Sequence, residues 1–326
     1  MSVATARLYD KQTSEKFYDE RYSGGYMDDW PPEKKHRVIE VIRGLNLPES
    51  GEALDFGCGN GVFTEVIRLA LPQWQIYGTD LSSVALQTAK TRYPDCNFFT
   101  PSDKNLMSKK FDFLFTHHVL EHVYNLDAVW REIVNFMKPD ASALHILPCG
   151  NEGSFEHAIC QLRVDGIDDQ IGSRFFFEDQ GHVRRLSTRQ MDELAARSGL
   201  ELAREYYANQ HHGAIEWITA SGMDFFLTLT ESENAKDAEA KAKLLKIRRK
   251  LKPVVWARDL VSGVRARRHK EKKTAKNWAG LIARLPIFVV CRIVDQQTRR
   301  KAEAEWEQSK NNRNGSEMYL HFKRTS

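Results

Sequence analysis

The sequence predicts an α/β fold in which a doubly wound, mostly parallel sheet carries helices on both faces. Between residues 33 and 208, apolar runs of strand length alternate with segments of helical periodicity. Residues 221–310 break that alternation with helical, basic patterns, and residues 317–323 then alternate like a strand. We therefore expect one sheet whose last strand follows a helical, basic insertion.

A glycine-rich turn organises the predicted sheet. The apolar run at residues 53–56 precedes Gly57, Gly59 and Gly61, and residues 62–71 have the apolar spacing of a helix. Glycine permits a sharp turn and a close ligand, and a helix N-terminus favours an anionic group. The dinucleotide fingerprint G-x-G-x-x-G would need glycine at position 62, which is valine. An ordinary tight turn is the alternative interpretation.

A second signal lies at the end of the next expected strand, residues 75–79. Asp80 follows it, about 20 residues after the glycine turn, where an acidic side chain can accept both hydroxyls of a ribose. An Asp in a solvated turn is the alternative. Together the two signals indicate an adenosine-type ligand across the strand ends.

The remaining elements follow from periodicity and capping signals. We expect helices at residues 33–45, 82–92 with a Ser82 cap, 125–137, and from the Ser187–Gln190 capping box to Gly199. We expect further strands at residues 97–99, 111–115, 143–147 and 201–207.

Composition restricts the class of protein. The N-terminal residues are polar, so no signal peptide is expected, and no run reaches the roughly 18 apolar residues of a spanning helix. Five scattered cysteines without a C-x-x-C pair predict reduced thiols in the cytosol. The net charge of +4 conceals a block at residues 241–300 with 19 Lys/Arg and three acids. Such asymmetry concerns partners rather than fold.

In their order, these motifs resemble the class I S-adenosylmethionine-dependent methyltransferases, in the branch of ubiquinone-pathway O-methyltransferases and sugar or natural-product methyltransferases. The matching segments are residues 54–61, Asp80, Phe111-Asp112, residues 119–123 and Lys138-Pro139-Asp140. The resemblance covers about residues 15–208, with residues 317–323 as final strand. It implies a seven-stranded sheet whose last strand is antiparallel, and S-adenosylmethionine as cofactor. Two departures are Pro139-Asp140-Ala141 in place of Pro-Gly-Gly and a blurred acidic motif after the third strand.

The resemblance also implies site residues and a domain plan. It implies that Asp55, Gly57, Gly59 and Gly61 shape the site for the methionine part of the cofactor, and that Asp80 with Leu81 holds the ribose. Ser102 or Asp103 would contact the adenine, and Thr116 or His117 would lie beside the sulfonium. Tyr18 and Arg21 would belong to a lid, in which Arg21 can pair with the methionine carboxylate. The corresponding domains are residues 1–46 (lid and first helix), 47–209 (cofactor-binding core), 210–315 (helical basic insertion) and 316–326 (final strand).

Methyl transfer from a sulfonium mostly requires positioning of the two reactants, and a hydroxyl acceptor benefits from a general base. His117 and His118 follow the fourth strand, and His182 lies in the loop before the capping box. We expect His118 or His182 as base, with His117 as a further candidate and a structural role as the alternative for each. Glu121-His122 is expected to shape the turn.

Residues 118–122 also read H-x-x-E-H, a zinc-peptidase signature that would place both histidines on one helix face. The segment directly follows a buried strand, which is the wrong context for that signature. The sequence therefore predicts no metal site.

Three interpretations of the basic insertion remain open. Residues 277–294 interleave apolar and basic residues around Pro286, as in a segment that lies on an anionic membrane surface. The same residues could instead cover the active site or form a homodimer face. Nucleic-acid binding is the third interpretation, but Thr116-His117-His118-Val119 stands where an N-P-P-Y-type motif would lie.

We therefore predict a cytosolic methyltransferase, peripheral on the inner membrane face if the insertion binds lipid. The expected acceptor is an oxygen of a small molecule, sugar or lipid-linked intermediate. A nucleic-acid methyltransferase and a non-catalytic S-adenosylmethionine-binding partner protein are the alternatives.

Overall fold

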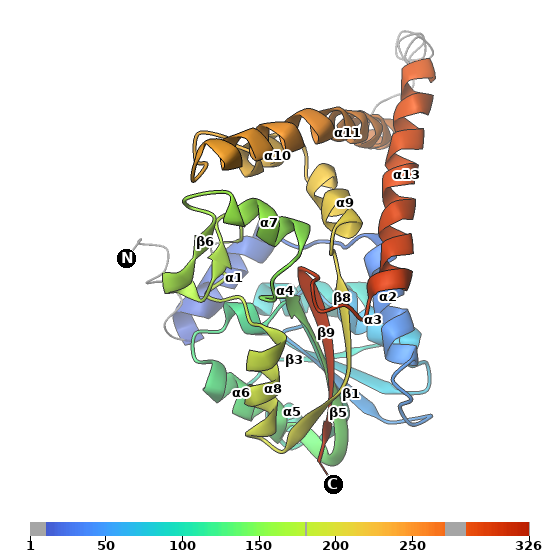
Figure 1. The fold of residues 1–326 in the computed structure, drawn as a ribbon. Coiled ribbons are helices and arrows are strands. Elements are labelled where there is room, and N and C mark those ends of the chain that lie inside the picture. The colour runs from blue at the N-terminus through green and yellow to red at the C-terminus, as the bar shows by residue number, and fades with distance from the viewer. Residues whose placement is uncertain (1–10, 180, 271–284, 326) are drawn as a thin grey trace. The chain divides into compact units, whose positions relative to one another are not determined.

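The computed structural model describes residues 11–179, 181–270 and 285–325 (Figure 1). The chain divides into two compact units. Unit 1 comprises Met1–Pro148, Asp179–Glu205 and Met318–Ser326, and unit 2 comprises Cys149–Glu178 and Tyr206–Glu317. Residues 149–178, a stretch without motifs in the sequence, thus join the helical insertion in unit 2.

The sheet has seven strands in the order β3-β2-β1-β4-β5-β9-β8. The strands are β1 Glu52–Phe56, β2 Gln75–Thr79, β3 Asn97–Phe99, β4 Phe111–His117, β5 Met137–Pro148, β8 Leu200–Ala208 and β9 Glu317–Arg324. The first five pair in parallel, whereas β8 and β9 run in opposite directions (Figure 1). This mostly parallel, seven-stranded arrangement confirms the predicted fold class.

Helices cover both faces of the sheet. They are α1 Lys11–Ser23, α2 Pro32–Arg43, α3 Val62–Ala70, α4 Ser83–Arg92, α5 Lys104–Met107, α6 Leu126–Asn135 and α8 Thr188–Ala196, with the 3₁₀ turn η2 Leu120–His122. α2 and α3 lie on one side, and α6 and α8 lie on the other (Figure 1). The predicted caps are present: Ser82 accepts from the Ala85 N–H, and Ser187 and Gln190 form a capping box.

The boundary between α6 and β5 differs from the sequence prediction, and the helices α1, α5 and α7 (Phe155–Gln161) were not predicted. β5 begins at Met137, six residues before the expected start, because its pairing with β4 continues through an irregularity across the polar, exposed Pro139-Asp140. The preceding helix α6 consequently ends at Asn135. The helix α1 was not predicted, since its composition is polar and its aromatic residues follow no strict helical period.

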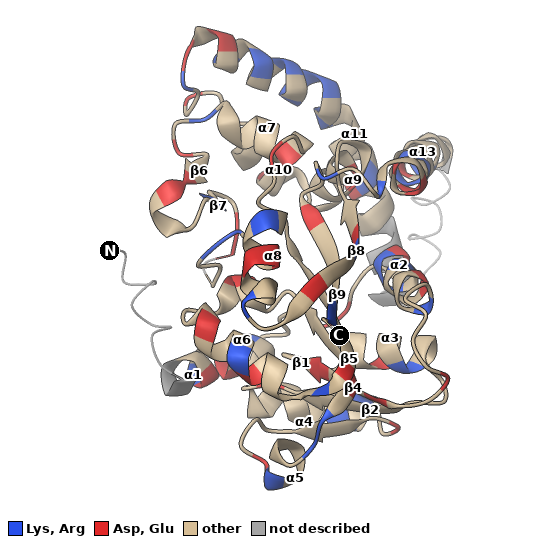
Figure 2. Ribbon diagram, turned by 60° about the horizontal axis from the view of Figure 1, so that its bottom comes forward, with Lys and Arg blue, Asp and Glu red and all other residues tan. Residues whose placement is uncertain are grey.

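Unit 2 consists mainly of helices around its own apolar core. Its elements are α7 Phe155–Gln161, the paired β6 Ile167–Asp168 and β7 Arg174–Phe175, η3 Asp169–Ile171, α9 His212–Ala220, α10 Met223–Leu229, α11 Ala238–Lys270 and α13 Leu285–Ser309. Arg258 of α11 is buried and donates to Asp295 at 2.9 Å and to Glu216, which ties α11 to α13 and α9. Lys and Arg recur along α11 (Figure 2).

Candidate active site

Unit 1 contains a cavity of about 390 Å³ at the carboxyl ends of β1, β2 and β4. This volume is typical of sites for small molecules and cofactors. The walls combine the glycine turn, the end of β2, aromatic side chains from the N-terminal segment, and histidines. The lining residues are Ser14, Tyr18, Tyr22, Tyr26, Met27, Trp30, Asp55–Asn60, Val62, Phe63, Thr79–Leu81, Pro101, His117–Val119, His122–Asn125, Val129, Glu132, Asp179 and His182.

The glycine turn is built on backbone conformations that other residues rarely adopt. Gly57 has φ +80° and Gly59 has φ +52°. A Cβ on Gly57 would lie 2.5 Å from Cγ2 of Val119, and a Cβ on Gly59 would collide with the hydroxyl of Tyr22. The turn therefore depends on glycine for conformation and for space.

Asp80 anchors this turn through its carboxylate. Its Oδ2 accepts from the Gly59 N–H and its Oδ1 from the Ser82 N–H, both at 2.8 Å. Burial raises the pKa of Asp80, while these two hydrogen bonds act to lower it. Asp55, fully buried at the end of β1, accepts from Thr64 at 2.7 Å, and burial raises its pKa to about 7.

The N-terminal segment covers the cavity with aromatic rings. Tyr18, Tyr22, Tyr26 and Trp30 line it, and α1 packs against α4. Asp19 of α1 accepts from the Ser82 hydroxyl at 2.5 Å.

Arg21 ties the same helix to the loop before α8. Its Nη1 donates to Asp179 Oδ1 at 2.7 Å, and its guanidinium lies 3.7 Å from the centre of the Tyr26 ring. Despite burial, the Arg21 hydrogen bond and the Gly181 N–H lower the pKa of Asp179 to about 2. In this conformation Arg21 is thus paired with an acidic residue of the protein.

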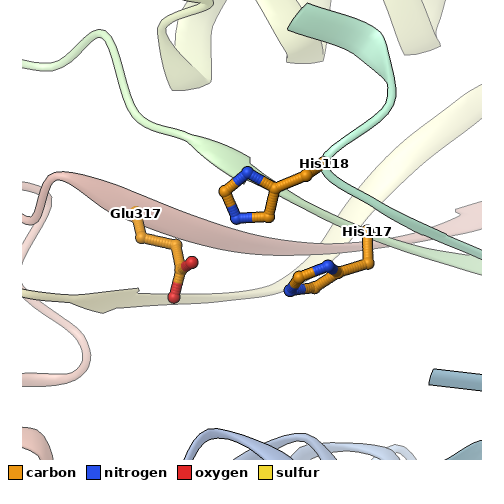
Figure 3. Close-up of side chains that lie close together, drawn as sticks. All are labelled: His117, His118 and Glu317. Carbon is orange, nitrogen blue, oxygen red and sulfur yellow. The ribbon is translucent and has the colours of Figure 1, made fainter. Parts of the chain in front are cut away.

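His118, which lines the cavity, forms a close pair with the buried Glu121. His118, just beyond β4 (Figure 3), has φ +55°, an uncommon conformation for a non-glycine residue. Its Nδ1 lies 2.9 Å from Oε1 of Glu121, whose side chain is fully buried. Burial would raise the pKa of Glu121, but the contact with His118 and the nearby His122 and His182 lower it to about 2.

The other histidines differ in environment. His117 is the last residue of β4 rather than beyond it (Figure 3), and its ring stacks on Phe63 with centroids 3.8 Å apart. His122 and His182 lie edge to face with ring centroids 4.5 Å apart. Burial lowers the pKa of His122 to about 4.

Several residues expected at the site do not line the cavity. They are Arg21, Gly61, Ser102, Asp103 and Thr116. Asp103 instead caps α5 by accepting from the Asn105 N–H at 2.8 Å, and the Thr116 hydroxyl bonds Nδ1 of buried His145 at 2.8 Å. Conversely, sequence reasoning did not identify Asp179, since an acidic residue in a loop of residues 148–182 carries no signal by itself.

The H-x-x-E-H segment does not form the α-helix that its zinc-peptidase signature requires. The backbone of His118 has a left-handed conformation, and within this segment only Leu120–His122 form a 3₁₀ turn. His118 and His122 therefore do not occupy successive turns of one helix face.

Comparisons with known proteins agree with the fold and the glycine turn. A family model described as "Methyltransferase domain" matches residues 31–205. The trans-aconitate 2-methyltransferase of Escherichia fergusonii is 23% identical over 222 residues, which cover 64% of this chain and 84% of that protein.

Two of the solved structures that match part of this chain have TM-scores below 0.5. The YcgJ protein from Bacillus subtilis is 15% identical, with a TM-score of 0.43 and coverage of 64% of this chain and 88% of its own. The mitomycin 7-O-methyltransferase MmcR is 19% identical, with a TM-score of 0.42 and coverage of 63% and 56%.

The family match spans more than half of the chain and contains the glycine turn, Asp80 and the His118–Glu121 pair. The chain therefore belongs to the methyltransferase-domain family, as an enzyme of class I that uses S-adenosylmethionine.

Proposed function

We propose that this enzyme methylates an oxygen atom of a small molecule, a sugar or a lipid-linked intermediate, with His118 as the general base. The observation that carries the proposal is the His118–Glu121 pair, whose His118 lines the same cavity as the glycine turn while Glu121 is buried next to it. A base within reach of both reactants is what a hydroxyl acceptor needs.

The cavity residues suit the cofactor. Gly57 and Gly59 line the cavity without side chains, which supports a backbone cradle for the methionine part, and Asp80 with Leu81 borders the place proposed for the ribose. Asp55 and Tyr18 complete this cofactor side. S-adenosylmethionine supplies a methyl group already activated by its sulfonium.

The remaining assignments follow from where each side chain lies. We assign His117 rather than Thr116 to the sulfonium side, since the Thr116 hydroxyl is engaged by His145. Ser102 or Asp103 stays the proposed adenine contact, next to the cavity-lining Pro101. Arg21 is assigned to holding α1 in place, because it pairs with Asp179.

Glu121 favours one tautomer of the His118 ring. A buried carboxylate that accepts from Nδ1–H favours the tautomer in which Nε2 is the basic nitrogen. The acceptor hydroxyl would pass its proton to Nε2 while its oxygen takes the methyl group. The backbone strain at His118 supports a functional rather than a structural role for this side chain.

Replacing His118 tests the base directly. We expect His118→Gln to lower kcat by about 10²- to 10⁴-fold and to leave the affinity for S-adenosylmethionine nearly unchanged. His36→Gln, at an exposed position on α2, is the matched control. An unchanged kcat in His118→Gln would transfer the role to His182 or to no base at all.

The acceptor class is tested by labelled S-adenosylmethionine added to a lysate of the source cells, which is then separated into organic, aqueous, nucleic-acid and protein fractions. Label in the organic or aqueous fraction supports a lipid-linked or small-molecule acceptor. Label in nucleic acid would favour the nucleic-acid methyltransferase, and no label in any fraction would leave either an acceptor absent from the lysate or the non-catalytic binding protein.

Unit 2 carries an observation that favours membrane docking. Four apolar residues in the first turns of α13 are about half exposed, and the most exposed is Val290 at 61%. They are Ile287, Val289, Val290 and Ile293. Of the segment expected to lie on a membrane, residues 277–284 are outside the described residues. No described helix is long and apolar enough to cross a membrane.

We therefore propose that the first turns of α13 insert into an anionic lipid surface, aided by the exposed Lys and Arg along α11. The double variant Val290→Glu, Ile293→Glu should lose co-sedimentation with phosphatidylserine vesicles at physiological salt, and Val164→Glu, a comparably exposed valine elsewhere in unit 2, should retain it. A wild-type protein that does not co-sediment would leave the covering and homodimer interpretations.

A further inference from the structure

Three side chains with metal-binding atoms meet beside the proposed base. Glu121 and His122 end the turn η2 after β4, and His182 comes from the loop before α8. Their ligand atoms all lie within 4.8 Å of one another. The Val183 N–H donates to the Glu121 carbonyl at 2.8 Å, which holds the two segments together.

We propose that Glu121, His122 and His182 bind a divalent transition-metal ion of the zinc type. Two imidazoles and one carboxylate form the ligand set of catalytic zinc sites, in which further coordination positions stay open. The sequence led to the opposite expectation because the H-x-x-E-H segment, with His118 and His122, directly follows a buried strand, which is the wrong context for a zinc peptidase. In the structure the second imidazole comes from His182, 60 residues further along the chain.

The state of the Glu121 carboxylate supports this assignment. The side chain is fully buried, Oε1 lies next to His118, and Oε2 has no hydrogen-bond partner among the described residues. A buried carboxylate oxygen without a partner is costly, and a bound ion is one of its ordinary explanations.

The distances suit a small adjustment on binding. Ligand atoms around a tetrahedral zinc stand about 3.3 Å apart, so side chains whose ligand atoms lie within 4.8 Å of one another need to close by at most about 1.5 Å. His118 would remain the neighbour of Glu121 and orient its carboxylate, as second-shell partners do in metal sites.

The site opens toward the acceptor side of the cavity. His122 and His182 line the cavity whereas Glu121 lies behind them. A cation there would draw an acceptor oxygen and lower the pKa of its hydroxyl, whose proton passes to His118. This role rests on the proposed function, but metal binding itself does not. We therefore expect the acceptor to have a hydroxyl group that can coordinate a metal ion.

Cobalt(II), a spectroscopic substitute for zinc, tests the site without cofactor or acceptor. Untagged protein titrated with Co²⁺ should develop a visible absorption band that saturates at about one ion per chain. Glu121→Gln and His182→Gln should each weaken Co²⁺ binding by at least about 10-fold, whereas His36→Gln should match the wild type. Unchanged S-adenosylmethionine affinity in His182→Gln would show that the variant is folded.

Two results would overturn the proposal: no saturable band in the wild type, or equal Co²⁺ affinity in His182→Gln and wild type. Neither depends on methyl transfer, so the loss of kcat expected in His118→Gln would still stand. Conversely, an intact Co²⁺ site in a protein without methyl transfer to any acceptor would refute the proposed function and leave the metal site.

Discussion

The two sides of the cavity are built in different ways. On the side proposed for the cofactor, the backbone of residues 57–59 forms a turn that one carboxylate, Asp80, holds from the end of β2. On the side proposed for the acceptor, titratable side chains meet from two segments that are far apart in the sequence, residues 117–122 on one and Asp179 and His182 on the other. A cofactor shared by many enzymes suits a fixed backbone cradle, whereas an acceptor site can change by side-chain substitution.

The largest expected effect is a loss of cofactor affinity that leaves the proposed acceptor side unchanged. Asp80→Ala removes the acceptor of two backbone hydrogen bonds and the proposed ribose contact, so S-adenosylmethionine affinity should fall by at least about 100-fold. Calorimetry measures the affinity, and circular dichroism should show a retained fold. Co²⁺ binding on the acceptor side should not change.

Asp95→Ala, at an exposed turn, is the matched control for Asp80→Ala. If Asp80→Ala bound the cofactor like the wild type, the ribose assignment would be wrong, and Asp80 would serve only the glycine turn.

This difference explains what the sequence could predict. The glycine turn and Asp80 are local patterns whose meaning depends on strand and helix geometry, so the fold class and the caps at Ser82 and Ser187 followed from periodicity and residue type. The early beginning of β5 at Met137 was not predictable, because Pro139-Asp140 is typical of the end of a helix and yet lies within a strand.

The acceptor side was only partly accessible from sequence. His118 and His182 stood out as histidines near strand ends, but their partners did not. Glu121 was expected to shape a turn, and Asp179 had no signal, because a contact between residues 158 positions apart, such as Arg21 with Asp179, leaves no local pattern. Unit 2 was recognisable by its charge, whereas the membership of residues 149–178 was not.

A smaller expected effect is a loss of folding stability at low pH, to which the two halves of the sheet contribute differently. β1, β2 and β3 contain no histidine, whereas β5 and β9 contain buried His145 and His321. Burial lowers their pKa values to about 3 and about 4, from a usual value near 6.5. The unfolded chain therefore binds protons first as pH falls, and stability present above pH 6.5 is lost progressively toward pH 4.

At pH 5 each histidine should reduce the free energy of unfolding by about 2 kcal/mol relative to pH 7. Urea unfolding at both pH values measures the loss, which His321→Gln should lessen and His36→Gln should not change. An equal loss in His321→Gln and wild type would mean that other groups, on either half of the sheet, dominate the acid response.

The smallest expected effect concerns the ion pair between Arg21 and Asp179, which joins α1 to the loop before α8. Arg21 belongs to α1, whose Tyr22 covers Gly59 on the proposed cofactor side, and Asp179 lines the cavity next to the proposed acceptor side. Because both side chains are partly exposed, their coupling should be about 1 kcal/mol in a double-mutant cycle of Arg21→Gln and Asp179→Asn. Hydrogen exchange in α1 should quicken in both single variants, and cofactor affinity should fall by a few-fold. A coupling near zero, with α1 protected as before, would mean that the Asp19–Ser82 hydrogen bond and the aromatic rings hold the helix, and that the two sides of the cavity act independently.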